Sequence, residues 1–314
     1  MKAIAEQIPE QIPEQASRKI SSSRASSMKT ILKAAYSKIV FIILFVVFIG
    51  ACSFKTYYNN LDYLIPSYIE DMVSLDDMLE ERVTQRAQVL INWHRNTQLM
   101  QYADLLRSFQ QSFGPHLTEE RVYEHLTAME SLWTPLGEKL NEEMASLMPL
   151  LNDDQIEELF DSIDEKNEDF YDEYINLDKD ERKKAYSERL FENYENWLGN
   201  LTEQQETDIE KTVHLFRSSA HLRLEQRKKW QRNIRDILYS DDAVASKTER
   251  LRVFFKKFNT VRVAALADTD NTNKRVLASL TTKLVHAATV DQREHFMNKT
   301  DEYIRIFTEL AENR

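Results

Sequence analysis

Glycine and proline are scarce in this chain, with 4 and 6 residues among 314. Sheet proteins need turn residues at intervals of roughly 8–12 positions, and so few glycines and prolines cannot supply them. The scarcity therefore predicts an all-α fold. A single cysteine excludes an internal disulfide framework and any zinc or iron–sulfur site built from several cysteines. Charged residues at 30% and hydrophobic residues at 42% exclude both a disordered tail and a polytopic membrane protein.

An uncharged stretch near the N-terminus is the strongest single signal. Residues 39–54 carry no charged side chain and are dominated by Ile, Val, Leu and Phe. A helix of this length spans about 24 Å, which is shorter than the roughly 20 residues that cross a bilayer. It is typical of the apolar core of a signal peptide, and three lysines (Lys29, Lys33 and Lys38) precede it. The alternative is a signal anchor that stays in the inner membrane.

The end of this stretch reads Ile49-Gly50-Ala51-Cys52. It resembles a bacterial lipobox, with Ile49 in place of the commoner leucine. The resemblance implies that a signal peptidase recognises Ile49, Gly50 and Ala51, and that Cys52 carries a covalent diacylglycerol and an N-acyl chain. By the sorting rules of such proteins, Ser53 favours the outer membrane, with the chain facing the periplasm. The partners implied are membrane lipid and the lipoprotein processing and sorting machinery.

These observations divide the chain into four parts. Residues 1–27 repeat Ile-Pro-Glu-Gln and then become serine-rich, which indicates either a disordered extension or a start site assigned too early, the true one being Met28. We interpret residues 28–51 as the lipoprotein signal peptide, 52–58 as a tether and 59–314 as a helical periplasmic domain. Without residues 1–51 the chain loses 7 of its 41 basic and 3 of its 52 acidic residues, leaving a net charge of −15. Such a charge argues against binding to nucleic acid.

Five segments share one helix-start pattern, in which a Thr, Asn or Asp follows an apolar residue and precedes acidic residues: Leu117–Arg121, Leu151–Gln155, Leu177–Glu181, Leu201–Gln205 and Ala288–Gln292. The Thr, Asn or Asp can cap a first helical turn, and a Glu or Gln three residues later completes a capping box in four of the five. Arg121 breaks the box in the first. Because the segments are irregularly spaced, we interpret them as helix caps and not as a solenoid repeat.

A single multi-helix domain of about eight or nine helices is expected from the apolar periodicity. The segments are 60–73, 75–95, 98–113, 118–148, 153–176, 179–199, 203–239, 245–260, 272–287 and 290–312, some of which merge. The polar run Asp268–Asn273 begins like a calcium loop but lacks the glycine and the glutamate such a loop needs. We interpret it as a break that caps the next helix.

Charge is distributed unevenly along the domain. The segment Glu138–Arg182 holds 17 acidic and 4 basic residues, whereas Arg217–Arg262 holds 13 basic and 5 acidic residues. The two segments either face one another or are solvated, or else they form a polarised surface for an envelope protein or for lipid headgroups.

Two ends of the domain resemble an uncharacterised family of proteobacterial lipoproteins, a domain of unknown function. The resemblance rests on these residues: Tyr58-Asn59-Asn60-Leu61-Asp62, Leu75-Asp76, Trp93-His94-Arg95, Leu99 with Tyr102-Ala103, and a final helix from Asp291-Gln292-Arg293 through Tyr303 to Leu310-Ala311. Met100 stands where the family pattern has a proline. The resemblance implies a helical, lipid-anchored envelope protein, and it implies no activity, cofactor or catalytic residue.

Trp93, His94 and Arg95, with Tyr102 nearby, are the candidate binding residues. A histidine base and an arginine anion clamp beside an aromatic wall would form a site. Consecutive helical residues point about 100° apart, however, so a structural role in the core or at a helix end is the competing interpretation. His214, His221 and Glu225 are too widely spaced to share a metal ion.

No catalytic residue, metal or non-covalent cofactor is therefore expected, and we do not expect an enzyme. The expected function is that of a lipid-anchored scaffold or interaction protein of the cell envelope, with an unknown envelope protein as partner. The alternative is a chaperone-like holdase of the periplasm. Such a protein would expose a contiguous apolar patch on a concave helical surface.

Overall fold

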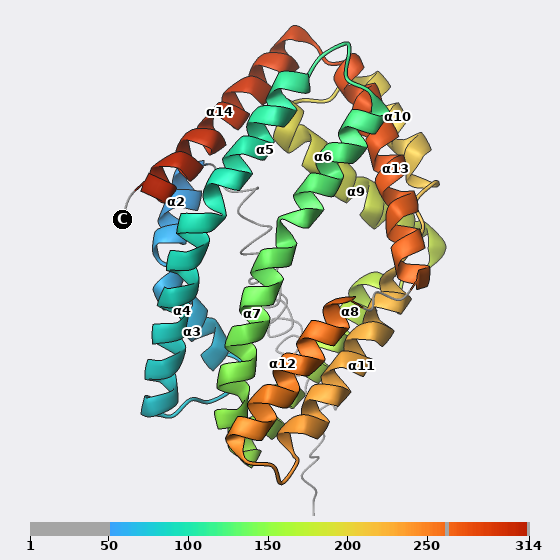
Figure 1. Cartoon of the computed structure of the whole chain (residues 1–314). Helices are drawn as coiled ribbons and strands as arrows, with labels where there is room; N and C mark the ends of the chain where they lie inside the picture. Colours follow the sequence, from blue (N-terminus) through green and yellow to red (C-terminus); the bar gives the residue numbers. More distant parts are fainter. Residues whose placement is uncertain (1–50, 261–263, 313–314) are drawn as a thin grey trace, which may run out of the picture. The chain divides into compact units, whose positions relative to one another are not determined.

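The computed structural model describes residues 51–260 and 264–312, and within them every regular element is a helix (Figure 1). The helices are α2 (Ala51–Asn59), α3 (Leu61–Glu70), α4 (Asp77–Thr97), α5 (Leu99–Ser112), α6 (Glu119–Ser131), α7 (Trp133–Leu147), the 3-10 turn η2 (Met148–Leu150), α8 (Asp153–Tyr174), α9 (Lys179–Leu198), α10 (Glu203–Val213), α11 (Ala220–Leu238), α12 (Val244–Thr260), α13 (Ala264–His286) and α14 (Val290–Glu312). The all-α prediction is confirmed, although the helices outnumber the eight or nine expected.

The five helix-start patterns are helix caps. Asn152, Asp178 and Thr202 each accept a hydrogen bond from a first-turn amide, and the Gln or Glu three residues on bonds back to the capping residue's own amide. Thr289 and Gln292 make the same two bonds, at 3.2 and 3.1 Å. Thr118 caps α6 without a box, as the arginine at position 121 predicts. Capping thus accounts for the motif in all five places.

Two of the capping glutamines also join distant helix starts. Gln205 and Gln292 exchange reciprocal side-chain hydrogen bonds of 3.0 and 2.8 Å. Both side chains are buried, at 0% and 3% exposure. Gln205 further donates to the Leu284 carbonyl, and Gln292 donates to the Asn200 carbonyl. One amide pair therefore ties the starts of α10 and α14 to one another, to the end of α13 and to the loop that follows α9.

Two long predicted helices are each divided in the structure. The predicted helix 118–148 is interrupted at Leu132, just before α7 places Pro135 in its first turn. Proline has no amide to donate to the carbonyl four residues earlier, so the division has a local cause. The predicted helix 203–239 ends at Val213 and resumes at Ala220. His214 and His221 consequently do not share one helix.

The run Asp268–Asn273 is not a break, because α13 passes through it without interruption. Asp and Asn side chains disfavour helices when they bond to the nearby backbone, but here they bond elsewhere. The Asn273 side chain accepts from the Arg217 amide and donates to the Arg217 carbonyl, both at 2.8 Å. Asp270 accepts from Arg223 at 2.6 Å. The polar residues of α13 thereby hold the linker between α10 and α11.

Two clusters of buried apolar side chains form the core. In the first, α5 packs along α14 and α6 along α13, and Phe113 stacks on Phe296 with ring centres 4.0 Å apart. In the second, α7 packs on α12 and α8 on α11. The acidic and basic segments therefore face one another, as one interpretation of the charge pattern predicted. Glu142 accepts from Arg252 at 2.6 Å, and Arg235 lies 5.1 Å from the Phe160 ring centre.

The residues expected to form a tether, 52–58, lie in helix α2. Phe54 and Tyr58 are one helical turn apart and are only 4% and 5% exposed, so this segment contributes to the core. None of the helices described combines the length and the apolar character needed to cross a bilayer. Residues 39–50 lie outside the described part of the chain.

Candidate functional site

His94 lies in the last turn of α4, and Tyr102 lies in the first turn of α5. The two helices are joined at the buried Gln98, which brings residues eight positions apart together. The His94 Nε2 atom lies 3.0 Å from the Tyr102 hydroxyl. Two of the predicted binding residues therefore do meet.

Tyr58 of α2 contacts the second ring nitrogen of His94. Its hydroxyl lies 2.9 Å from His94 Nδ1, so both imidazole nitrogens are hydrogen-bonded. A neutral imidazole has one N–H and one lone pair. One tyrosine therefore donates to His94 and the other accepts from it, which forms a chain of three side chains from three helices.

Burial sets the protonation of this chain. It lowers the pKa of His94 from 6.5 to about 4 and raises the pKa of Tyr102 to about 12. Burial also raises the pKa of Tyr58. All three groups are thus neutral at pH 7. A general base works best with a pKa near the operating pH and a free lone pair, and His94 has neither.

Aromatic rings enclose this hydrogen-bonded chain. Phe307 of α14 lies edge-on to Phe54 with ring centres 5.5 Å apart, and 5.9 Å from the ring of Tyr102. Beside them the Lys55 ammonium contacts the Glu309 carboxylate at 2.8 Å. The cluster of Phe54, Tyr58, His94, Tyr102 and Phe307, which we call the aromatic junction, fastens α2 onto α4, α5 and α14.

The other two residues of the Trp-His-Arg motif take structural positions. The Arg95 guanidinium lies 5.3 Å from the Tyr58 ring centre and donates to Asn59 at 3.3 Å. The Trp93 ring lies edge-on to His94, with ring centres 6.4 Å apart. Arg95 thus packs on α2 and is not aimed into a pocket with His94. Among the described residues no group of three or more histidine, cysteine and carboxylate side chains could hold a metal ion.

The predicted processing residues lie at or before the start of the fold. Ile49 and Gly50 lie outside the described residues, and Ala51 and Cys52 are the first two residues of α2. The proposed acylation position therefore leads directly into the helix that ends in the aromatic junction.

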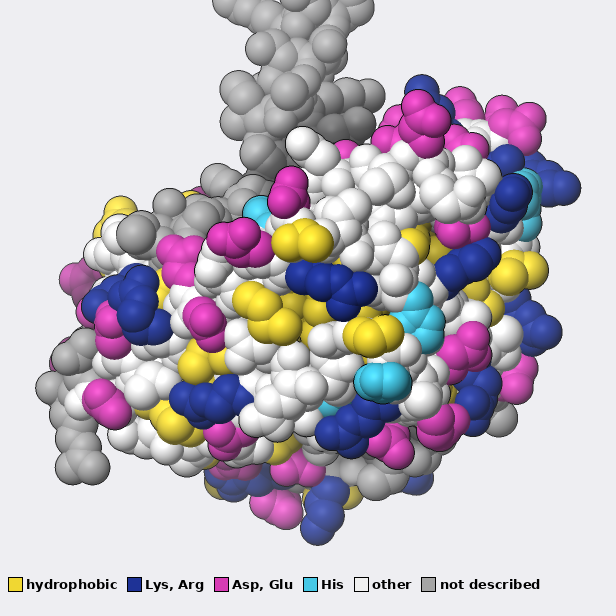
Figure 2. Space-filling view, turned by 90° about the horizontal axis from the view of Figure 1, so that it is seen from above, with side chains coloured by type: hydrophobic (Ala, Val, Ile, Leu, Met, Phe, Trp, Pro, Cys, Tyr) yellow, Lys and Arg dark blue, Asp and Glu magenta, His cyan; other side chains and the backbone are white. Residues whose placement is uncertain are grey.

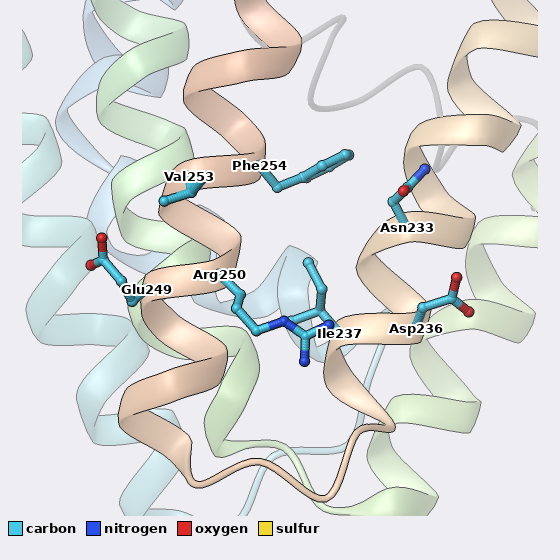
Figure 3. Close-up of a pocket in the computed structure, with 7 residues that line it drawn as sticks. All are labelled: Asn233, Asp236, Ile237, Glu249, Arg250, Val253 and Phe254. Carbon is cyan, nitrogen blue, oxygen red and sulfur yellow. The ribbon is translucent and has the colours of Figure 1, made fainter.

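A groove of about 450 Å³ lies between α11 and α12. Its lining residues are Asn233, Asp236, Ile237, Glu249, Arg250, Val253 and Phe254. Figure 3 shows Arg250 and Phe254 pointing from α12 toward α11, while Glu249 points away. Arg250 also forms an ion pair with Asp242. The polar groups of the groove do not converge on a common point, so it does not have the geometry of an active site.

A mixed surface lies where α5 and α13 end and α6 and α14 begin. His286 Nε2 lies 2.8 Å from the Leu117 carbonyl, and His295 Nε2 lies 3.3 Å from the Asn196 carbonyl. Val290 is 78% exposed there. Figure 2, which views the molecule from above, shows hydrophobic, histidine and basic side chains together on the face it presents. The two imidazole contacts are to backbone carbonyls and bridge helix ends.

Comparison with known protein families gives one match. Residues 71–257 match DUF6279, a family of unknown function. The chain belongs to this family. The match includes His94 and Tyr102 but not Phe54, Tyr58 or Phe307. Comparisons with curated proteins and with solved structures found no match. The expectation of a family without known activity is confirmed, and its lipoprotein nature stays a prediction.

Phe54 and Phe307 belong to the aromatic junction, although neither was predicted as a site residue from the sequence. Two local signals were present, because Phe54 and Tyr58 are four residues apart and so are Tyr303 and Phe307. That spacing places two aromatic rings on one helical face. The pairing of these two faces could not be read from spacing alone, since 253 positions separate the two phenylalanines.

Proposed function

We propose that this chain is a lipid-anchored protein of the cell envelope with a non-enzymatic scaffold or interaction role. The observation that carries the proposal is the sequence Ile49-Gly50-Ala51-Cys52 at the end of an uncharged stretch that is too short to span a bilayer. Cleavage before Cys52 and acylation of its thiol and new amino group account for both features. A single acyl chain binds membranes only marginally, whereas two signals suffice for stable anchoring.

The outer membrane is the proposed location, with the helical domain in the periplasm. Ser53, the residue after the acylated cysteine, favours export to that membrane over retention. The competing arrangement is an uncleaved signal anchor in the inner membrane, which would leave Cys52 unmodified.

The aromatic junction supports a non-enzymatic role. His94, the most base-like residue of the Trp-His-Arg motif, has both nitrogens bonded to tyrosines and a pKa of about 4. The predicted binding residues His94 and Tyr102 therefore hold helices together, because His94 is hydrogen-bonded to Tyr102 and to Tyr58.

The described surface favours a scaffold over a holdase. A holdase needs one contiguous apolar face. The large hydrophobic side chains that are more than 55% exposed come instead from five separate segments: Tyr63 on α3, Met78 on α4, Leu215 between α10 and α11, Val253 on α12 and Val290 on α14. Helix α8, in contrast, exposes most of its carboxylates. A partner with a basic surface would complement α8, because opposite charge steers association.

Separation of inner and outer membranes on a density gradient tests the location. The wild-type chain should sediment with the outer membrane, and Ser53→Asp should remain in the inner membrane. Cys52→Ala should accumulate unprocessed. Wild-type protein found only in the inner membrane, indistinguishable from Cys52→Ala, would refute lipid-directed sorting.

Light scattering tests the choice between scaffold and holdase. A chemically unfolded model enzyme is diluted into buffer that contains the detergent-extracted full chain, with a known periplasmic holdase as the positive control. We expect the unfolded enzyme to aggregate as fast as in the detergent alone. Suppression of aggregation at equimolar chain would favour the holdase.

A further inference from the structure

The folded domain begins almost at the proposed acylation position. Only Ser53 separates Cys52 from Phe54, whose side chain is 4% exposed and packs edge-on against Phe307. The next residue, Lys55, is ion-paired to Glu309. Helix α2 is therefore attached to α14 from its first turn, and Cys52 is itself a residue of that turn.

This attachment limits how far the domain can lie from the membrane. Two residues span about 7 Å when fully extended and about 3 Å in a helix. The headgroup region of one leaflet is roughly 5–7 Å thick. Acyl chains on Cys52 would lie in the hydrocarbon layer, so the start of α2 cannot move beyond the headgroups without losing the Phe54 and Lys55 contacts.

The side of α2 away from its packed face exposes an aromatic residue. Phe54, Lys55, Tyr58 and Asn59 all make contacts to other helices, while Tyr57 is 40% exposed. Tyr63, in the first turn of α3, is 71% exposed. Tyrosine combines an apolar ring with a polar hydroxyl, and for this reason it is enriched at the membrane–water interface.

We propose that the surface formed by α2 and the first turn of α3, with Tyr57 and Tyr63, lies against the phospholipid headgroups of the membrane that holds Cys52. The inference rests on the acylation of Cys52 proposed above and goes beyond it, because it fixes the orientation of the domain. The domain works at the membrane surface and does not extend on a tether into the aqueous space.

Spin labels on introduced cysteines test this orientation. Acylation consumes the thiol of Cys52, the chain's one cysteine, so a label attaches only where a cysteine is added. Tyr63→Cys reports on the proposed surface. Val290→Cys is a control of similar exposure, 78% against 71%, at the opposite end of α14. It lies 19 residues before Glu309, which is about 28 Å along the helix.

The full acylated chain is reconstituted into vesicles of phosphatidylethanolamine and phosphatidylglycerol that contain a nickel-chelating headgroup lipid. We expect nickel to relax the label at position 63 several-fold more strongly than the label at position 290. Tyr57→Cys and Tyr239→Cys, at native exposures of 40% and 44%, form a second matched pair. Tyr239 is the C-terminal cap residue of α11, whose side chains pack in the second core cluster and not in the aromatic junction, so we expect the same order.

A flexible glycine–serine insertion between Ser53 and Phe54 should reduce relaxation at position 63 to the level at position 290. Equal relaxation at both positions in the acylated chain without the insertion overturns the orientation alone. The intact mass of the same sample separates this outcome from failure of the proposed function, because an unacylated chain overturns both.

Discussion

Acidification should destabilise this protein through His94. The folded pKa of His94 is about 4, because the side chain is buried, whereas the ordinary value is 6.5. Below pH 6.5 the imidazole of His94 therefore binds a proton in the unfolded chain but not in the folded chain. The free energy of unfolding consequently decreases as the pH falls from 6.5 toward 4. Each pKa unit corresponds to about 1.4 kcal/mol. The full loss is about 3 kcal/mol, of which about 2 kcal/mol is reached at pH 5.

Urea unfolding of the detergent-solubilised full chain at pH 7.5 and pH 5, with and without His94→Gln, measures this loss. Glutamine can still bridge Tyr58 and Tyr102 but does not titrate. Burial also lowers the pKa of His125, but that residue is common to both proteins and cancels in the comparison. The wild-type chain should lose about 2 kcal/mol more than the variant between the two pH values. Equal losses would mean that His94 is protonated readily in the folded state, and the structural role assigned to it would be wrong.

Two further pairs of substitutions test the helix caps and turns. Gln205→Leu should lower the free energy of unfolding by about 3 kcal/mol, because it removes both hydrogen bonds to the buried amide of Gln292 and the bond to the Leu284 carbonyl. Gln155→Leu, at a more accessible cap, should cost about 1–2 kcal/mol. Gly199→Ala should destabilise by about 1 kcal/mol, since φ is +77° there, whereas Gly137→Ala inside α7 should stabilise by up to about 1 kcal/mol.

Urea unfolding of each variant at pH 7.5 provides both comparisons. Equal effects at the two glutamines would contradict the buried amide pair between α10 and α14. The methyl group added by Gly199→Ala would meet no closer atom than His295 Cγ at 3.5 Å, so the cost comes from the backbone and not from crowding. A stabilising Gly199→Ala would contradict the positive φ at the end of α9.

Features that depend on neighbouring residues were predictable from the sequence. A helix cap joins residues three positions apart, so the caps at Asn152, Asp178 and Thr202 could be recognised from their spacing. The all-α class followed from the lack of turn residues. One interpretation of the charge pattern was that the acidic segment Glu138–Arg182 and the basic segment Arg217–Arg262 face one another. Helix α8 of the first segment does pack on α11 of the second.

Features that depend on distant contacts were not predictable. The run Asp268–Asn273 has the composition of a loop, and it is helical because Asn273 bonds to Arg217, 56 positions away. In residues 52–58 the four-residue spacing of Phe54 and Tyr58 is a helical signal, but it separates a packed helix from a tether only when Phe307 provides a surface for Phe54. For the candidate site, proximity along α4 and α5 indicated His94 and Tyr102, whereas the contribution of α2 required the fold.

Intact mass of the membrane-extracted protein, beside Cys52→Ala, tests the central claim most directly. A wild-type mass equal to Cys52–Arg314 plus a diacylglycerol and an N-acyl chain, with Cys52→Ala left uncleaved, is the predicted result. An uncleaved and unacylated wild-type chain would contradict the lipid anchor and indicate a signal anchor instead.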